Sequence, residues 1–405
     1  MHLQQALRNE TRVESPANSP GSRRRLVLLT EIISPYRIPV FNALASQPVI
    51  DLHVIFLAET DPTQRQWRVY KDEIKFSYEV LPSWRRRLGN HNILLNGKVR
   101  SALQAAAPDV IVCGGYNYAA SWQALWWARS HQVPFLVWVE STSADRRNRY
   151  RLIEFLKRKF ILSCDGVIAA GTSSGEYVRG FGVDNGSLFV APDAVDTEMF
   201  SSRAESARRN EEVLRKQLDL PRRFFLFVGR MIREKGIFDL LKAYAGLPAM
   251  LREEVGLVFV GEGPKRAEAE RQAAVISPGS VRCAGFVQRE DLPMYYGLAE
   301  SFVFPTHSDP WGLVVNEAMS CRLPVICSDA AGCAADLVVE GLNGRVVPAG
   351  DPQALGTAMR QLATEAGLRL QMGDRSWDRI QLHSPEACAA GIAAAAQFCG
   401  VPRNV

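Results

Sequence analysis

Two basic side chains lie close together in a glycine-bounded segment, residues 229–236 (GRMIREKG). Arg230 and Lys235 follow an apolar run, residues 224–228 (FFLFV), that is typical of a buried strand. An arginine binds two oxygens of a phosphate at once, and a lysine adds a compact positive charge. The segment therefore predicts a phosphate-binding loop, and a charged surface turn is the alternative.

A second polar segment, residues 307–319 (HSDPWGLVVNEAM), follows another apolar run. Asp309 and Pro310 are typical of a helix N-cap and a first helical position, so we expect a helix over residues 311–320. A rise of about 1.5 Å per residue then separates Asp309 from Glu317 by roughly 12 Å. Carboxylate pairs of hydrolytic glycosidases are closer, at about 5 to 9.5 Å. The two carboxylates are instead predicted to contact opposite ends of an extended ligand whose phosphates lie at the helix N-terminus.

Short apolar runs alternate with longer helical stretches along the chain. The predicted strands are residues 26–30, 53–57, 110–113, 135–139, 166–170, 188–191, 224–228, 257–260, 281–284, 301–304, 325–327 and 345–347. Strands that are apolar on both faces and separated by helices predict parallel sheets covered by helices. A polar stretch, residues 201–210, interrupts the alternation and is predicted to be a linker or a surface helix. We therefore expect two doubly wound units, with ligands bound between them beyond the carboxyl ends of the strands.

Composition excludes several classes of protein. The chain has 405 residues, of which 47% are hydrophobic and 22% charged, so it is neither disordered nor fibrous. No apolar stretch reaches the 18 or so residues of a spanning helix, and the first 25 residues show no secretion signal. Its eight cysteines form no CxxC pair and its six histidines are dispersed. We expect a cytoplasmic protein with no cofactor and no protein-bound catalytic metal.

Positive charge is concentrated in residues 84–162, which contain 13 Lys and Arg against 4 Asp and Glu, together with five of the eight tryptophans. This combination suits a membrane surface or an anionic partner, and a solvated basic face over a tryptophan-rich core is the alternative. No nucleic-acid-binding motif accompanies the charge, so a nucleic-acid partner is not expected. Within this window, residues 146–162 predict either a membrane-facing amphipathic helix or an ordinary helix whose apolar stripe covers the sheet.

The motifs carry a resemblance. Gly-Arg-x-x-x-x-Lys-Gly, and then an acidic residue eight positions before the Glu of a Glu-Ala pair, resembles the donor-binding domain of the retaining glycosyltransferases of family 4, which have the GT-B fold. Five further segments match the family in order: residues 192–200 (PDAVDTEMF), 260–264 (VGEGP), 284–287 (AGFV), 324–326 (PVI) and 343–344 (NG). The resemblance covers about residues 26–375 and is most specific in the second half. It implies an α/β fold of two Rossmann-like domains and transfer of a sugar from a nucleoside diphosphate sugar to a hydroxyl acceptor, such as a glycan or a lipid-linked sugar.

The resemblance also implies roles for single residues. Arg230 and Lys235 hold the diphosphate, Asp309 faces the donor sugar, and Glu317 accepts hydrogen bonds from the ribose. The implied donor-binding residues are Gly229, Arg230, Lys235, Gly263, Phe286, Val287, Asp309, Leu313, Val314 and Glu317. The chain departs from the family at Asp309, where a glutamate is usual, and at residues 332–336 (GCAAD), where the family has Gly-Gly-x-x-Glu.

The first half offers acceptor-binding candidates. Tyr36 and Arg37 belong to a Pro-Tyr-Arg loop after the first predicted strand, Gly115 follows the third, and Glu140 follows the fourth. Glu140 is predicted to be an acceptor-side polar group or base, and it belongs with Arg230, Lys235 and Asp309 to the predicted catalytic set. A structural turn at residues 36–37 and a buried, helix-capping Glu140 are the alternatives.

The predicted organisation is a polar leader (residues 1–24), an acceptor-binding domain (25–205), a donor-binding domain (206–384) and a tail (385–405) that returns to the first domain. Two other functions stay open. One is a nucleotide-sugar epimerase of the same fold, and the other is a catalytically weak nucleotide-sugar-binding protein. We expect a cytoplasmic location, with peripheral contact to the inner membrane surface through residues 146–162.

Overall fold

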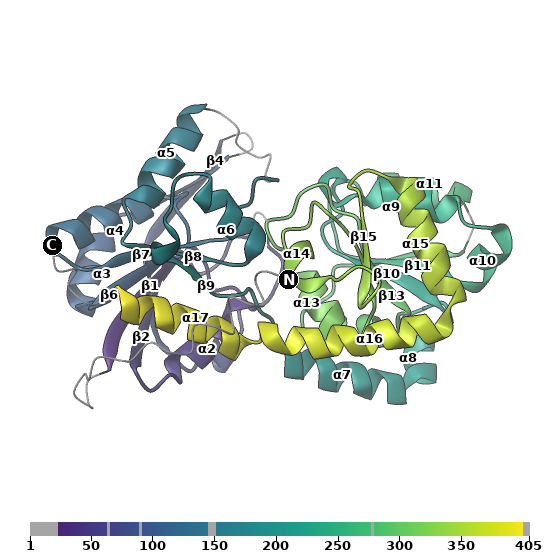
Figure 1. Ribbon diagram of the computed structural model, residues 1–405. Helices are drawn as coiled ribbons and strands as arrows, with labels where there is room; N and C mark the ends of the chain where they lie inside the picture. Colours follow the sequence, from purple (N-terminus) through teal and green to yellow (C-terminus); the bar gives the residue numbers. More distant parts are fainter. Residues whose placement is uncertain (1–22, 63–64, 89–90, 145–150, 277–278, 400–405) are drawn as a thin grey trace.

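The predicted apolar strands form two parallel sheets, one in each half of the chain (Figure 1). A computed structural model describes residues 23–62, 65–88, 91–144, 151–276 and 279–399. Almost all of the predicted leader therefore lies outside the described residues. The expected pair of doubly wound α/β domains is confirmed.

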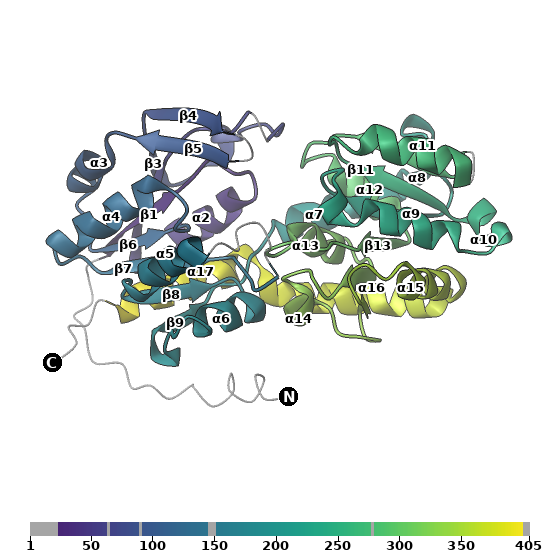
Figure 2. The same ribbon diagram turned by 90° about the horizontal axis from the view of Figure 1, so that it is seen from above.

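The first sheet has the strand order β3-β2-β1-β6-β7-β8-β9 within the described chain. Its strands are β1 Arg24–Thr30, β2 Ile50–Phe56, β3 Ser77–Val80, β6 Val110–Cys113, β7 Phe135–Val139, β8 Gly166–Ala169 and β9 Leu188–Val190. Its helices are α2 Arg37–Ala45, α3 Val99–Ala106, α4 Ala119–Ser130, α5 Arg151–Leu162 and α6 Thr172–Arg179. An antiparallel hairpin, β4 Ser83–Leu88 and β5 His91–Asn96, lies at the edge of this domain (Figure 2). The sequence analysis missed β3 and the hairpin.

The second sheet has the order β12-β11-β10-β13-β14-β15. Its strands are β10 Phe224–Val228, β11 Gly256–Val260, β12 Val281–Gly285, β13 Ser301–Phe304, β14 Val325–Ser328 and β15 Gly344–Val347. The helices of this half are α7 Thr197–Arg209, α8 Glu211–Gln217, α9 Ile237–Ala245, α10 Ala249–Glu254, α11 Arg266–Ile276, α12 Leu292–Leu298, α13 Leu313–Ser320, α14 Ala334–Leu337, α15 Pro352–Thr364 and α16 Ala366–Ile380. All five residues of β10 are buried because helices cover both faces of the sheet.

Strand order fixes where ligands can bind. In each domain the chain first builds outward on one side of a central strand and then crosses to the other side, so the order reverses between β1 and β6 and between β10 and β13. Doubly wound sheets bind ligands beyond the carboxyl ends of strands at such a switch point. A ligand is therefore expected to bind at the loops after β1, β6, β10 and β13.

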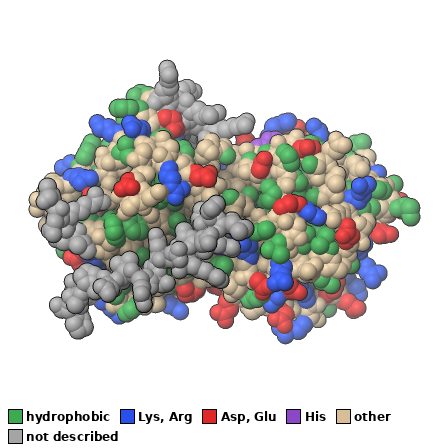
Figure 3. Space-filling model, in the orientation of Figure 1, with side chains coloured by type: hydrophobic (Ala, Val, Ile, Leu, Met, Phe, Trp, Pro, Cys, Tyr) green, Lys and Arg blue, Asp and Glu red, His purple; other side chains and the backbone are tan. Residues whose placement is uncertain are grey.

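Helix α7 confirms one of the two alternatives predicted for residues 201–210, a surface helix. The polar stretch at residues 201–210 is helical, and α7 packs against α12 of the second domain through buried Phe200 and Ala204. The predicted boundary after residue 205 placed most of this helix in the first domain. Ion pairs such as Glu211–Arg215 at 2.7 Å occupy the solvent side of the helices that follow, and Figure 3 shows acidic and basic side chains interspersed over the second domain.

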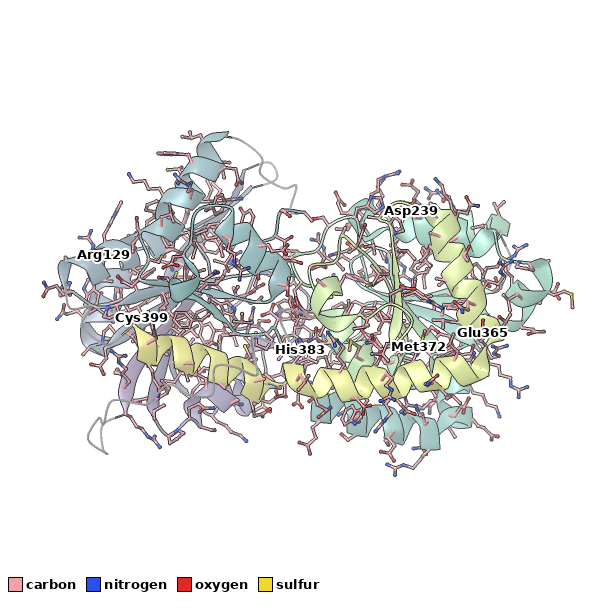
Figure 4. All side chains as sticks on the ribbon, viewed as in Figure 1. Arg129, Asp239, Glu365, Met372, His383 and Cys399 are labelled. Atoms are coloured by element: carbon pink, nitrogen blue, oxygen red, sulfur yellow. The ribbon has the colours of Figure 1, made fainter. Side chains whose placement is uncertain are left out.

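The end of the chain crosses between the domains. Helix α16 lies along the second domain, and α17 (Pro385–Phe398) packs on α2 and β9 of the first. Figure 4 traces this crossing from Glu365 through His383, at the junction of the two helices, to Cys399 on the first domain. Within the described residues, no helix has both the length and the apolarity needed to cross a membrane.

Candidate functional site

The predicted phosphate loop follows β10 and turns back against the end of β13. Gly236 has a φ of +70°, and a Cβ at this position would lie 1.8 Å from the carbonyl oxygen of Pro305. A glycine is therefore required for the loop to approach the backbone after β13 so closely. The same turn places Lys235 beside Asp309.

Arg230 and Lys235 have different surroundings. The Lys235 ammonium forms an ion pair with Asp309 and lies 5.6 Å from the centre of the Phe304 ring. Arg230 is exposed, and its side chain has no ion pair or hydrogen bond within the part of the chain that the structure describes. One predicted phosphate-binding cation is thus held by a carboxylate, and the other is available to an anion.

Asp309 does not cap a helix as predicted. Helix α13 begins at Leu313, after Gly312, whose φ of +102° turns the chain. Asp309 lies in the preceding loop, where its Oδ1 accepts a hydrogen bond from the Trp311 amide at 3.2 Å. The carboxylate pairs with Lys235. The prediction of an N-cap at Asp309 is therefore wrong, because the helix begins only after Gly312, three residues later.

Glu317 is fully buried on α13. The Tyr296 hydroxyl donates a hydrogen bond to its Oε2 at 2.6 Å, and burial raises its pKa to about 7. Its Oε1 atom is buried without a hydrogen-bond partner among the described residues. Tyr36 of the first domain lies close to Glu317. Burial raises the pKa of Tyr36, and the nearby charge of Glu317 raises it further. Tyr36, predicted to be an acceptor-side residue, therefore packs on the second domain beside the predicted ribose carboxylate.

The other predicted donor-side residues surround the same loops. Gly263 follows β11, and a Cβ there would lie 2.5 Å from the Met231 carbonyl oxygen. Hydrogen bonds of 2.7 to 2.9 Å join the backbones after β10, β11 and β12, as in Gly229 N–Val260 O. Phe286 is 39% exposed, and Val287, Leu313 and Val314 are partly buried.

Arg37 holds two carboxylates of the first domain. Its guanidinium forms ion pairs with Asp193 at 2.9 Å and with Glu140, and it lies 4.1 Å from the centre of a Trp138 ring. Asp193 is 1% exposed, and burial raises its pKa well above its ordinary value against the opposing charge of Arg37. Gly115, the remaining acceptor-side candidate, has a φ of +110° in the loop after β6.

Asp193 is a site residue that the sequence reasoning did not single out. It lies in the segment at residues 192–200, which carries the family resemblance only as a whole. The negative charge of Asp309 also raises the pKa of Asp193, so the carboxylates of the two domains lie near each other. The carbonyl oxygen of Asp193 accepts a hydrogen bond from Asn316 of α13 at 2.9 Å.

Further contacts join the two domains around these side chains. Ser308 donates a hydrogen bond to the Ala144 carbonyl oxygen at 3.1 Å. Asp336 of α14 accepts hydrogen bonds from the Thr172 amide at 2.9 Å and the Thr172 hydroxyl at 2.6 Å, at the start of α6. Asp336 is therefore an interdomain contact. The loops at the carboxyl ends of both sheets converge on one region that holds Arg230, Lys235, Asp309, Glu317, Arg37, Glu140 and Asp193.

This region combines cations and hydrogen-bond acceptors suited to an anionic, hydroxyl-rich ligand. Within the described residues, no group of three or more His, Cys, Asp or Glu side chains is arranged to hold a metal ion. No disulfide joins cysteines within the described ranges of the chain.

Comparisons with known proteins agree with this arrangement. The family model Glycosyltransferase Family 4 matches residues 42–199, and Glycosyl transferases group 1 matches residues 209–378. A D-inositol 3-phosphate glycosyltransferase of Xylanimonas cellulosilytica is 30% identical over 251 residues, or 60% of this chain and 59% of that protein. O-antigen chain mannosyltransferase B of Escherichia coli is 32% identical over 177 residues, or 43% and 42% of the two chains. The chain spans about half the length of the curated relatives it matches.

Among solved structures, Anabaena HepE in complex with UDP is similar, with a TM-score of 0.72 and 19% identity over 91% of this chain and 98% of that chain. At this identity the likeness shows a common fold of two facing domains. The two family models match one region in each half of the chain, residues 42–199 and 209–378.

Proposed function

Because the chain belongs to the glycosyltransferases of group 1 and family 4, we propose that it moves a sugar from a nucleoside diphosphate sugar to a hydroxyl acceptor, with retention of configuration and without a metal ion. The observation that carries this proposal is the convergence of Arg230, Lys235, Asp309 and Glu317 at the switch point of the second sheet, with Glu140 facing them from the first. Complexes of HepE with UDP and with UDP-glucose support the class of donor.

The diphosphate binds at the loop after β10. Arg230 meets it with a free guanidinium, and the diphosphate replaces Asp309 as the partner of Lys235. Asp309 then accepts a hydrogen bond from the donor sugar. The amides of Leu313 and Val314 at the start of α13 add the favourable field of a helix N-terminus.

The ribose end of the donor lies at Glu317. The unpartnered Oε1 atom is an acceptor for a ribose hydroxyl, which reaches it when Tyr36 withdraws from the carboxylate. Since a carboxylate accepts hydrogen bonds only, the ionised form of Glu317 is the one that binds two hydroxyls.

In the transfer step, the bond between the anomeric carbon and the phosphate oxygen breaks, and the diphosphate keeps the electron pair. The acceptor oxygen bonds to the anomeric carbon from the face that the diphosphate leaves, and its proton passes to the departing phosphate oxygen. Arg230 and Lys235 stabilise the negative charge that develops on the diphosphate. Glu140, held by Arg37, accepts a hydrogen bond from the acceptor hydroxyl and positions it.

A thermal-shift screen against UDP-, GDP-, ADP- and dTDP-glucose tests the donor site, because a ligand that binds only the folded protein raises its apparent stability. We expect Arg230→Ala to abolish the shift. Arg233→Ala is the matched control, since Arg233 lies in the same loop but pairs with Glu268 at 2.6 Å. If Arg230→Ala and Lys235→Ala both keep full donor affinity, the proposed site is wrong.

Product analysis separates the remaining alternatives. Retention predicts that the anomeric configuration of the product, read by NMR, equals that of the donor, and metal independence predicts full activity in EDTA. Release of epimerised nucleotide sugar without acceptor indicates an epimerase. A protein that binds the donor but never releases nucleoside diphosphate is a binding protein only.

We also propose that α5 contacts a membrane that carries a lipid-linked acceptor. Leu152, Phe155 and Leu156, spaced as one helix face, are 69, 58 and 44% exposed. Arg158 and Lys159 are exposed on the same helix, whereas Phe160 and Ile161 are buried on the sheet side. The helix therefore covers the sheet and still presents apolar and basic side chains to solvent, a combination that binds anionic lipid surfaces. Residues 146–150 of the predicted segment lie outside the described residues.

Vesicle sedimentation tests this contact. We expect the wild-type protein to sediment with vesicles of phosphatidylglycerol and phosphatidylcholine, and the double variant Leu152→Glu, Phe155→Glu to stay in solution. Val213→Glu on α8 is the matched control, because Val213 is 57% exposed on the other domain. Equal sedimentation of the wild type and the double variant contradicts the membrane proposal and leaves the donor site untouched.

A further inference from the structure

A loop of the first domain, residues 65–70, lies against the second domain. The Arg68 amide donates a hydrogen bond to Gln288 Oε1 at 3.2 Å, and the Gln288 side-chain amide donates to the Gln66 carbonyl oxygen at 3.3 Å. Tyr70 also contacts Glu290 through its hydroxyl. These contacts fix the loop next to the segment that follows β12.

Arg65 of this loop faces Arg230 of the second domain. The Arg65 side chain is exposed, but nearby protein atoms lower its pKa by desolvation, and the positive charge of Arg230 lowers it further. The two guanidinium groups therefore lie within electrostatic range across the domain boundary. The Arg65 guanidinium lies 4.7 Å from the centre of the Trp67 ring, which holds it in this position. Two like charges repel each other at short range, and an anion between them turns this repulsion into two attractions.

The carboxylates near Arg65, those of Asp61 and Glu31, also interact with Arg85. Arg85 forms an ion pair with Asp61 at 2.5 Å and lies 3.5 Å from Glu31. The opposing charges around Arg65 are therefore shared, and Arg230 has no carboxylate partner in the described ranges of the chain.

The aromatic contacts of this loop extend from Arg65 toward Glu317. The Trp67 ring packs edge-on against Tyr36, with 6.2 Å between ring centres, and Tyr36 approaches Glu317. Arg65, Trp67 and Tyr36 thus run from the proposed diphosphate end of the site to its ribose end. Glu317, fully buried with an unpartnered Oε1, marks the ribose end as a place for a ligand.

We propose that Arg65 is a further donor-binding residue, which binds the diphosphate from the first domain while Arg230 binds it from the second. Trp67 is a positioning residue, because its ring supports the Arg65 guanidinium. This inference rests on the proposed function, since it takes a nucleoside diphosphate as the ligand. In this arrangement the diphosphate of the donor contacts both domains at once, Arg65 from the first and Arg230 from the second.

Calorimetric titration with UDP, GDP, ADP and dTDP tests the inference on the full chain. For the nucleoside diphosphate that binds the wild type, we expect Arg65→Gln to raise Kd by about 10- to 100-fold, as befits the loss of a charge-assisted hydrogen bond. The affinity of the matching nucleoside, which lacks phosphates, stays within about twofold. Arg68→Gln is the control, because Arg68 lies in the same loop, is 70% exposed and faces Glu290 at 3.5 Å.

Stability separates binding from a merely structural role. We expect Arg65→Gln and Arg230→Gln each to leave the Tm of the ligand-free protein unchanged or to raise it. Each variant should also reduce the Tm shift caused by the diphosphate. Trp67→Phe keeps a ring beneath Arg65 and is expected to bind like the wild type, whereas Trp67→Leu weakens diphosphate binding and leaves nucleoside binding unchanged.

Three outcomes overturn the inference. If Arg230→Gln weakens diphosphate binding and Arg65→Gln does not, Arg65 has no part in donor binding, and the proposed function stands. If Arg65→Gln lowers the ligand-free Tm and leaves Kd unchanged, its role is structural. If neither arginine variant weakens binding, both the inference and the proposed donor site are wrong.

Discussion

Replacing Glu317 by glutamine should stabilise the protein at neutral and higher pH. Burial raises the pKa of Glu317 to about 7, whereas a glutamate in an unfolded chain titrates near 4.3. As pH rises above about 4.3, the unfolded chain loses this proton while the folded protein still holds it, so the free energy of unfolding falls until pH reaches about 7. At about 1.4 kcal/mol per pKa unit, this cost is about 1 kcal/mol at pH 5 and on the order of 3 kcal/mol at pH 8.

The glutamine variant carries no ionisable group, so it escapes this cost. For a domain of this size, about 3 kcal/mol corresponds to a rise in Tm of roughly 6 to 12 °C at pH 8. The assay is thermal unfolding of the wild type and Glu317→Gln without ligand at pH 5, 6, 7 and 8. Glu205→Gln on α7 is the control, because it makes the same replacement at a side chain that is 66% exposed.

The dependence on pH is the decisive readout. A rise in Tm of equal size at pH 5 and pH 8 would show that shape or hydrogen bonding, and not ionisation, controls stability at this position. No rise in Tm at pH 8 would show that neighbouring groups already stabilise the ionised form of Glu317 in the folded protein. The donor provides a second measure: if the carboxylate binds the ribose, wild-type affinity strengthens as pH rises toward 7, and the affinity of Glu317→Gln is weak at every pH.

Three other changes have expected outcomes. Lys235→Ala should lower kcat by about 100- to 1000-fold by removing a cation from the leaving diphosphate. Without donor it should also lower the free energy of unfolding, because Asp309 loses its partner in a partly buried site. A kinetic titration that finds kcat unchanged contradicts the assignment. Gly236→Ala should lower the free energy of unfolding by more than about 1 kcal/mol, because φ is +70° and Pro305 blocks a Cβ, whereas Gly367→Ala, in open space on α16, should be neutral or stabilising in the same urea titration. Asp336→Ala should lower Tm by the loss of about 1 kcal/mol from the start of α6, while Asp336→Asn, which keeps an acceptor, should lower it less.

Most of the fold could be predicted from the sequence because its strands are apolar on both faces. The runs at residues 110–113, 135–139, 224–228 and 301–304 form strands with the predicted bounds. Parallel strands covered by helices leave little room for polar residues, so their sequences stand out. The hairpin of β4 and β5 was missed since three consecutive arginines, residues 85–87, hide any alternation of apolar and polar residues.

The site was only partly predictable. The glycine-bounded loop after residues 224–228 located Arg230 and Lys235, because the backbone must turn sharply where that strand ends. The Asp-Pro pair after residues 301–304 located Asp309. Asp309 was nevertheless assigned to a helix cap, since the sequence could not show that Gly312 adopts a left-handed conformation and delays the helix. The burial of Glu317 and the approach of Tyr36 depend on how the domains meet, which no local pattern encodes.

The domain boundary also explains why Arg65 and Asp193 escaped notice. Arg65 gains the charge of Arg230, and Asp193 that of Asp309, from residues of the other domain that lie more than 100 positions away. In the same way, the periodicity of α5 indicates an apolar face, but it cannot say that Leu152 and Phe155 stay exposed while Phe160 is covered.

The ligand-free contacts favour an anionic donor over a neutral sugar. Lys235 is held by Asp309, and Arg37 is held by Glu140 and Asp193, so binding must exchange one partner for another. A neutral sugar cannot replace a carboxylate at Lys235 without leaving charges unpaired in a partly buried site. A diphosphate can make that exchange and also relieves the repulsion around Arg230, so the charge arrangement itself selects for the activated form of the sugar.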